Sequence, residues 1–196
     1  MRLEAVNFNN YIKAIEVQNE IFPEADGTLN ILASLDRDLF IKITGIKYPD
    51  DNVKYYLAYY EDKVIGITGL YKGENKKEAW IAWFGILPRL QGNGYGRQLL
   101  EETINLAKSS GYDVLRLYTD KNGNAKAIIL YEKLGFVGEK YLKEELAYDC
   151  VIYSKNLRDK KVALWNNKNL NLSHQSELDQ MDKQIITAIL NKYKKL

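Results

Sequence analysis

Apolar and polar positions repeat along this chain with two periods, which separate predicted strands from predicted helices. Residues 54–61 (KYYLAYYE) and 63–72 (KVIGITGLYK) are rich in β-branched and aromatic residues and flank the turn-like pair Glu61-Asp62. Two such runs around a short turn predict a β-hairpin. Residues 78–88 (EAWIAWFGILP) add a third strand to this meander. Shorter strand-like runs are LEAVNF, DVLRLYT and two segments of GFVGEKYLKEELAYDCVIYSKNL.

Helical periodicity predicts four helices between these strands. The first covers residues 9–22, with Tyr11, Ile12, Ile15 and Ile21 as core positions. It ends at Phe22-Pro23, because the residue before proline disfavours the helical region. The others cover residues 28–40, the segment from the glycine run to about Ser110, and residues 124–134. Strands and helices in this mixed order favour an α/β domain around a mixed sheet.

A last helix is predicted over residues 176–193, beyond the core segment. Its apolar stripe consists of Leu178, Met181, Ile185 and Ile189, and Ser176 with Asp179 resembles a capping box. The stripe must be buried on the core, on a second subunit or on a partner, and we favour the core. We therefore divide the chain into a domain over residues 1–157 and an extension over residues 158–196.

Composition narrows the classes of protein that remain. The chain has 196 residues, 46% of them hydrophobic, and a net charge of +2, which does not favour nucleic acid as a partner. No stretch approaches the roughly 18 apolar residues of a membrane span, and the first residues lack a signal-peptide layout. Cys150 is the only cysteine, so no intrachain disulfide forms. These features predict a cytoplasmic protein that is not bound to membranes.

A glycine-rich run, residues 86–100 (ILPRLQGNGYGRQLL), lies between a predicted strand and a predicted helix. A P-loop would need a Gly-Lys-Ser/Thr ending, and a Rossmann fingerprint would need G-x-G-x-x-G after a strand of a βαβ unit. Neither is present. The pattern that fits is Gln-x-x-Gly-x-Gly, from Gln91, Gly94 and Gly96. Backbone amides at a helix N-terminus lack partners and bind phosphate groups, and glycines let the ligand approach closely.

This run resembles the acetyl-CoA pyrophosphate motif of the GNAT superfamily of N-acetyltransferases. A second segment, NAKAIILYEKLGF, is similar to the family's later motif at five positions: Asn124, Ala127, Tyr131, Gly135 and Phe136. One helix and one strand separate the two motifs, as in the family, and AYDCVIYSKNL resembles its closing strand. The resemblance covers roughly residues 1–157. It implies a mixed, mostly antiparallel sheet of about seven strands flanked by helices, to which the C-terminal helical extension is added.

The resemblance implies an acetyl-CoA-dependent N-acetyltransferase that passes acetyl directly to the amine of a small molecule or peptide, with no metal. The implied cofactor-binding residues are Ile86, Leu87, Gln91, Gly92, Asn93, Gly94, Tyr95, Gly96, Arg97 and Asn124. A backbone amide of the strand before the glycines would stabilise the oxyanion, with Ile86 the best candidate and Leu87 its neighbour. Gly85 would permit a bulge there. Arg97 and Lys133 are equally well explained as phosphate contacts or as solvated helix residues.

Two side chains are implied catalytic residues. Tyr131 stands where the family places the acid that protonates the leaving thiolate, and a tyrosine is protonated at neutral pH. The alternative is a helix tyrosine packed on the sheet. Glu78 lies two residues before the position that supplies a carboxylate base in some relatives, a position held here by Trp80. Rival bases are Glu20, Glu24 and Asp26, and an ordinary surface carboxylate is the alternative for each.

Three further alternatives stay open. The first is a non-catalytic acyl-CoA-binding module that presents its tail helix to a protein partner. The second is transfer to a hydroxyl group, and the third is a homodimer contact through the tail. Trp80 and Trp83 point to opposite faces of their strand, so at most one faces an acceptor; sheet–helix packing is the favoured role of both. Cys150 is expected in the core.

Overall fold

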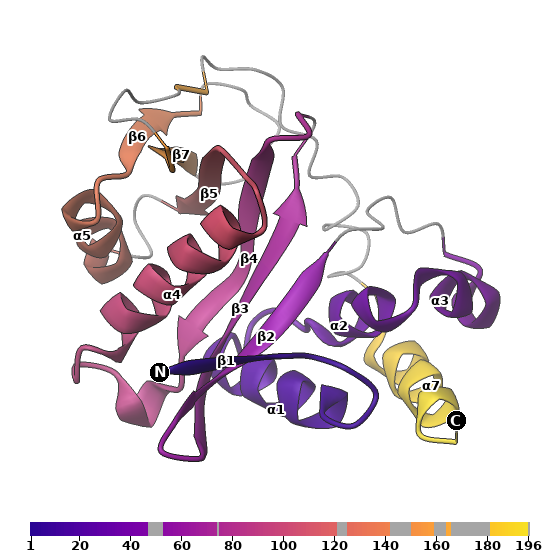
Figure 1. Cartoon of the computed structure of the whole chain (residues 1–196). Helices are drawn as coiled ribbons and strands as arrows, with labels where there is room; N and C mark the ends of the chain where they lie inside the picture. The colour runs from indigo at the N-terminus through magenta and orange to yellow at the C-terminus, as the bar shows by residue number, and fades with distance from the viewer. Residues whose placement is uncertain are drawn as a thin grey trace. The chain divides into compact units, whose positions relative to one another are not determined.

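The computed structural model describes residues 1–46, 53–73, 75–120, 125–141, 150–158, 164–165 and 181–195. They divide into two compact units. Unit 1 contains Met1–Gly69, Trp83–Leu99 and Asn171–Leu196, and unit 2 contains Leu70–Ala82 and Leu100–Leu170. Figure 1 traces the chain through its helices and strands. No helix within these described ranges is long and apolar enough to cross a membrane.

Seven strands form one mixed, mostly antiparallel sheet in the order β1-β2-β3-β4-β5-β7-β6. This confirms the predicted fold class. Their bounds are β1 (Arg2–Ala5), β2 (Lys54–Tyr60), β3 (Lys63–Lys72), β4 (Glu78–Ile86), β5 (Val114–Asp120), β6 (Val137–Lys140) and β7 (Cys150–Asn156). β4 and β5 pair in parallel where Glu78, Ala79 and Trp80 face Val114, Leu115 and Arg116. β5 and β6 both pair with β7 in antiparallel fashion.

The predicted hairpin turn between β2 and β3 is confirmed. Glu61 and Asp62 both have positive φ, 46° and 61°, which is the backbone geometry of a two-residue turn that matches the twist of its strands. On the other side of β2, β1 pairs with it from Arg2↔Tyr59 to Ala5↔Tyr56. These three strands therefore form a continuous antiparallel edge of the sheet.

The helices in the described part of the chain are α1 (Tyr11–Ile21), α2 (Thr28–Leu35), α3 (Arg37–Thr44), α4 (Tyr95–Ser109), α5 (Ala125–Lys133) and α7 (Lys183–Tyr193), with a short 3₁₀ helix η1 (Pro88–Leu90). α1 starts two residues later and ends one residue earlier than the predicted helix over residues 9–22. The single helix predicted over residues 28–40 is wrong. Asp36 is extended there, and its side chain accepts a hydrogen bond from the Leu39 amide, which ends α2 and starts α3.

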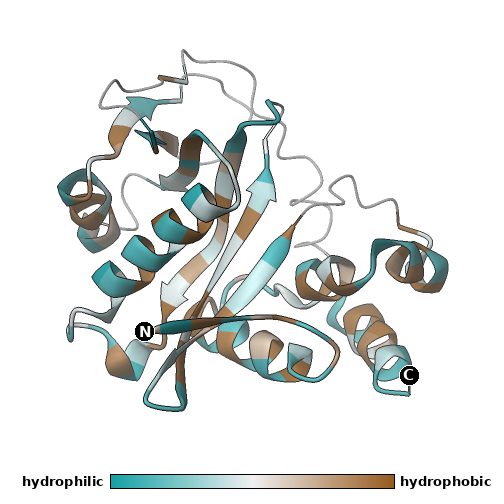
Figure 2. Cartoon of the chain, viewed as in Figure 1, coloured by the Kyte–Doolittle hydropathy of each residue, from teal (hydrophilic) through white to brown (hydrophobic). Residues whose placement is uncertain are grey.

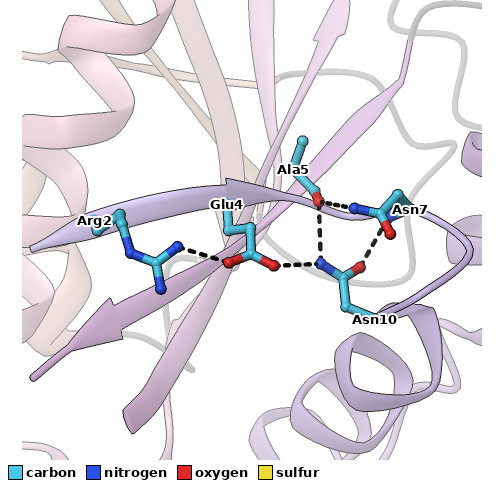
Figure 3. A network of polar contacts seen from close by, with 5 residues as sticks. All are labelled: Arg2, Glu4, Ala5, Asn7 and Asn10. Carbon is cyan, nitrogen blue, oxygen red and sulfur yellow. Dashed lines mark hydrogen bonds and ion pairs between the residues drawn. The ribbon is translucent and has the colours of Figure 1, made fainter. Parts of the chain in front are cut away.

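A polar network fixes the turn from β1 into α1, as Figure 3 shows. The Asn10 amide group donates to Glu4 Oε1 (2.9 Å) and to the Ala5 carbonyl oxygen (3.2 Å), while its oxygen accepts from the Asn7 backbone amide (2.8 Å). Arg2 donates to the other Glu4 oxygen (2.6 Å). The hydrogen bonds from Arg2 and then Asn10 lower the pKa of Glu4. The network is exposed, so it orients the turn more than it adds stability.

The C-terminal helix α7 packs on α2 and α3 within unit 1, as seen in Figure 1. Asp182 caps it by accepting from the Gln184 amide (2.7 Å). Its buried residues are Ile186, Ile189 and Tyr193, and Figure 2 shows the mixed hydropathy of the helix. Ile189 was predicted correctly. Ile185 was not, because its side chain is 49% exposed. Leu178 and Ser176 lie outside the described residues.

Unit 2 contains a buried aromatic cluster around Trp80. Trp80 lies in a buried cluster with Tyr141, Cys150, Ile152 and Trp165. The Trp165 ring meets the Trp80 ring edge-on, with centroids 5.1 Å apart. Burial raises the pKa of the Cys150 thiol to about 11, so Cys150 is a core residue, as expected. Trp165, one of the two residues described between 159 and 180, is thus part of this core.

Candidate active site

The glycine run forms an exposed loop between η1 and α4 in unit 1. Gly92 and Gly94 have φ of 84° and 79°, a region that L-residues with side chains rarely adopt. A Cβ atom built on either would meet nothing within 4 Å. The backbone conformation therefore requires these glycines, and the space above them is open.

Five successive backbone amides in this loop, from Gly92 to Gly96, have no acceptor within the described part of the chain. The next two amides, of Arg97 and Gln98, donate to the Gly94 carbonyl oxygen and so begin the helix. Amides at such a turn carry partial positive charge and bind anions. The predicted residues Gly92, Asn93, Gly94, Tyr95 and Gly96 thus present a row of donors that fits a pyrophosphate group.

Two polar side chains hold this loop in shape. Gln91 Nε2 donates to the Ile86 carbonyl oxygen (3.0 Å). Asn93 Nδ2 donates to the carbonyl oxygens of Leu90 (3.2 Å) and Gln91 (3.3 Å). Gln91 therefore braces the loop against the end of β4, and Asn93 braces it against the end of η1.

β4 is distorted just before the loop. Trp83 has φ of 41°, an outlier for a bulky residue that costs on the order of 1–3 kcal/mol. Gly85, where the sequence predicted the bulge, has a different function: a Cβ atom there would lie 2.5 Å from Ile21 Cγ2. A Cβ atom on Gly66 would lie 2.4 Å from the Gly85 carbonyl oxygen. Gly66 and Gly85 therefore permit close packing of β3, β4 and α1, and the backbone strain in β4 lies at Trp83.

The two candidate oxyanion donors differ in their surroundings. The Leu87 amide donates to the Ile65 carbonyl oxygen (2.9 Å), so it is already engaged in the sheet. The Ile86 side chain is buried in a cluster with Ala58, Ile65 and Leu99. This packing fixes the end of β4, and with it the direction of the Ile86 amide.

Tyr131 lies in unit 2, on α5, with its side chain buried. Its ring lies beside Phe136 and Tyr153, with centroids 6.1 and 5.6 Å away. Burial, and then the neighbouring Tyr153, raise the pKa of Tyr131 above its ordinary value of 10.0. The phenol is therefore protonated throughout the neutral range.

Glu78 lies at the start of β4 in unit 2, and its carboxylate is enclosed by partners. Oε2 is 2.8 Å from Arg116 Nε, and both side chains are at most 10% exposed. Oε1 accepts from Trp80 Nε1 at 3.0 Å. Arg116 also donates to Ser154 Oγ and lies over the Trp165 ring. These contacts engage both carboxylate oxygens, which favours a structural role for Glu78.

The rival carboxylates lie around the α1–α2 connection of unit 1. Glu20 forms an exposed ion pair with Arg89. Asp26 Oδ1 accepts from the Thr28 amide (2.8 Å) at the start of α2. Glu24 is exposed, and no hydrogen bond or ion pair is found for it among the described residues. Within the same residues, no group of three or more histidine, cysteine or acidic side chains is placed to hold a metal ion.

The sequence model of the acetyltransferase (GNAT) family matches residues 14–136, more than half of the chain. The chain belongs to the acetyltransferase (GNAT) family. The comparison with curated proteins found no match. The matched segment contains the glycine loop, β4 and Tyr131.

Solved structures of GNAT-type acetyltransferases share the fold. A chimera of the Vibrio cholerae spermidine N-acetyltransferase SpeG with hSSAT is 18% identical, with a TM-score of 0.62, over 80% of this chain and 97% of that one. A Bacillus subtilis acetyltransferase in complex with CoA is 20% identical, with a TM-score of 0.52, over 79% and 97%. A GNAT-family acetyltransferase from Streptococcus pneumoniae is 24% identical, with a TM-score of 0.55, over 79% and 98%.

The predicted GNAT residues fall on both units. Unit 1 brings together Ile86, Leu87 and the loop from Gln91 to Arg97, while Tyr131 and Glu78 belong to unit 2. Asn124 lies outside the described residues. Sequence reasoning missed the strain at Trp83 and its contact with Phe22, whose ring centroid is 5.1 Å from that of Trp83. The only available signal was that Trp83 and Gly85 sit close together in one strand.

Proposed function

We propose that this chain is an acetyl-CoA-dependent N-acetyltransferase that transfers acetyl directly to the amine of a small molecule or peptide. The observation that carries the proposal is the row of five amides from Gly92 to Gly96, for which no acceptor is found among the described residues, in a chain of the GNAT family. Acetyl-CoA presents a pyrophosphate to such donors. When bound, it supplies an acetyl group already activated as a thioester.

The glycine loop would hold the cofactor. The amides from Gly92 to Gly96 would donate to the pyrophosphate oxygens, with Gln91 and Asn93 keeping the loop rigid. Arg97, exposed at the first turn of α4, and Asn124 are proposed as further contacts to CoA. Preorganised donors of this kind bind without the entropic cost of ordering a loop.

The Ile86 amide is the proposed donor to the oxyanion. Attack by an amine turns the acetyl carbonyl into a tetrahedral oxyanion, which a fixed N–H group stabilises by about 3–4 kcal/mol in comparable sites. We choose Ile86 over Leu87 because the Leu87 amide already donates to Ile65. The buried Ile86 side chain would keep this amide in place during the reaction.

Tyr131 is the proposed donor to the leaving sulfur. Its raised pKa keeps the phenol protonated until the thiolate forms. Because a thiol has a pKa of about 8.5, complete proton transfer from this phenol costs free energy. We therefore propose that Tyr131 gives the sulfur a hydrogen bond as charge develops, and passes the proton as the thiol leaves.

The amine must lose one proton before or during attack. Glu78 is disfavoured because Arg116 and Trp80 hold its carboxylate. Among its rivals, Glu24 is the carboxylate for which no partner is found in the described residues. We propose that water accepts this proton, and that Glu24 is the alternative base.

The non-catalytic alternative requires the tail helix to be presented to a partner. Three of its apolar residues, Ile186, Ile189 and Tyr193, are instead buried, and α7 packs on α2 and α3. This arrangement favours the enzyme over the alternative. The SpeG chimera is a spermidine N-acetyltransferase by name, but at 18% identity the likeness extends to the fold and not to the acceptor.

Thiol release from acetyl-CoA in the presence of a panel of amines tests the proposal. The product is identified by mass spectrometry, which distinguishes an N-acetylated amine from hydrolysis or from acetyl transfer to a hydroxyl. We expect thiol release that depends on the amine. Binding of acetyl-CoA without release, across amines, peptides and alcohols, would support the non-catalytic module instead.

A further inference from the structure

Phe22 and Trp83 form a fixed aromatic pair in unit 1, which we call the aromatic wall. Their ring centroids are 5.1 Å apart and their planes are tilted by 53°. Both side chains are half-buried, so each still presents surface to solvent. Trp83 precedes Ile86 by three residues on β4, or about 10 Å along a strand.

The wall is held in place from both sides. On β4, Trp83 has a positive φ. Gly66 and Gly85 let β3 and α1 approach this strand more closely than any side chain would allow. Backbone strain at a bulky residue such as Trp83 is a reason to look for a function at that position.

The loop that carries Phe22 is pinned by a single buried side chain. Gln18 is fully buried; its Nε2 donates to the Ala25 carbonyl oxygen (2.9 Å) and its Oε1 accepts from the Gly27 amide (2.8 Å). The Ala25 amide closes the turn onto the Phe22 carbonyl oxygen (3.0 Å). The Phe22 ring is therefore presented by a rigid turn, which lowers the entropic cost of binding a ligand against it.

Most carboxylates around this loop are already engaged by other groups of the protein. Glu20 is paired with Arg89, and Asp26 caps the start of α2. Only Glu24 is without a partner among the described residues of this connection. A polyamine carries several positive charges and needs several free carboxylates, whereas a monoamine needs one at most.

We propose that the aromatic wall selects the acceptor, and that the acceptor is a primary monoamine on an aromatic or apolar body. This inference rests on the proposed function, because it places the acceptor near the oxyanion donor Ile86. The flat body of such an amine packs against Trp83 and Phe22 through aromatic contacts, and its ammonium group is attracted to an aromatic face before it loses its proton.

Calorimetric titration of 2-phenylethylamine and of spermidine into the full-length protein tests the inference, with and without saturating CoA. We expect 2-phenylethylamine to bind at least about tenfold more tightly than spermidine. Phe22→Leu keeps an apolar side chain and removes the ring, and Trp83→Asn removes the ring with a residue that tolerates positive φ. Each should weaken the binding of 2-phenylethylamine about fivefold, the loss of one aromatic contact.

Phe8→Leu is the matched control, because Phe8 is an exposed aromatic residue of the same unit, away from β4. It should leave both affinities unchanged. Equal or tighter binding of spermidine, no binding of 2-phenylethylamine, or wild-type affinity in both Phe22→Leu and Trp83→Asn would overturn the inference. Because binding is measured and not turnover, a protein that binds 2-phenylethylamine at the wall but acetylates no amine would refute the proposed function and leave the wall's selectivity standing.

Discussion

At the scale of single residues, the site combines strained backbone with unpartnered donors. Gly92 and Gly94 adopt positive φ in open space, which frees their amides for a ligand. Trp83 adopts positive φ although its side chain is bulky. This conformation costs free energy, so it points to a function at that position. Glu78 and Tyr131 are both buried, but Arg116 and Trp80 engage the Glu78 carboxylate, whereas burial raises the pKa of the Tyr131 phenol.

Tyr131→Phe tests the proposed acid. It removes the hydroxyl and keeps the ring, so the packing on Phe136 and Tyr153 should survive. We expect kcat to fall about 10²-fold, with the affinity for CoA nearly unchanged. Because burial raises the pKa of Tyr131, wild-type kcat should show no loss from its ionisation as the pH rises from 7 to 10.

Tyr193→Phe is the control for Tyr131→Phe. Tyr193 is also a buried tyrosine, and burial raises its pKa to about 12. No hydrogen-bond partner of its hydroxyl is found among the described residues, so its removal should leave both kcat and folding intact. If Tyr131→Phe turned over like the wild type, water or another group would have to supply the proton.

Glu78→Gln separates a structural carboxylate from a catalytic one. Removing one charge of a buried ion pair leaves Arg116 uncompensated, and we expect a loss of about 3 kcal/mol in the free energy of unfolding, measured by urea denaturation. The folded fraction should keep its kcat. Glu16→Gln, in the exposed pair with Lys13, should change the stability by less than about 1 kcal/mol. A stable but inactive Glu78→Gln would instead identify Glu78 as the base.

At the scale of elements, every described strand could be predicted from the sequence. Most of these strands are short runs rich in β-branched and aromatic residues, and such runs are typical of strands. It predicted one helix where there are two, since nothing in the periodicity of residues 28–40 shows that Asp36 becomes an N-cap. The buried face of α7 was also misplaced. Met181, Ile185 and Ile189 fit a helical stripe as well as Ile186, Ile189 and Tyr193 do, and only the packing on α2 and α3 decides between them.

The same limit applies to the site. The glycine loop was predictable because its spacing is local. The pairing of Glu78 with Arg116 was not, because 38 residues separate them and their contact depends on the parallel register of β4 and β5. The strain at Trp83 was also hidden, since a tryptophan in a strand normally indicates sheet packing.

Two isoleucines on α7 test how the C-terminal helix docks. Ile189 is 5% exposed and Ile185 is 49% exposed. Ile189→Ala should lower the free energy of unfolding by about 2–4 kcal/mol, because it leaves a cavity. Ile185→Ala should stay within about 0.5 kcal/mol of the wild type. Equal effects in thermal or urea denaturation would mean that α7 does not dock through this face.

At the scale of the whole molecule, the family model does not match the last part of the chain. Similar structures cover 79–80% of the chain, and the family model ends at residue 136. We propose that residues 158–196 are an extension of the family core. Within unit 2, Trp165 packs in the cluster around Trp80, and within unit 1, α7 packs on α2 and α3. We therefore expect the extension to contribute to stability.

Calorimetric titration of CoA into the wild type, Gly94→Glu and Gly45→Glu tests the central claim most directly. Both glycines have positive φ with nothing within 4 Å of an added Cβ, so both substitutions impose similar strain and add the same charge. Only Gly94 lies in the proposed pyrophosphate site, where two like charges at 4 Å repel by about 4 kcal/mol. We predict that the wild type and Gly45→Glu bind CoA equally and that Gly94→Glu binds at least about tenfold more weakly. Wild-type affinity in a folded Gly94→Glu would contradict the account.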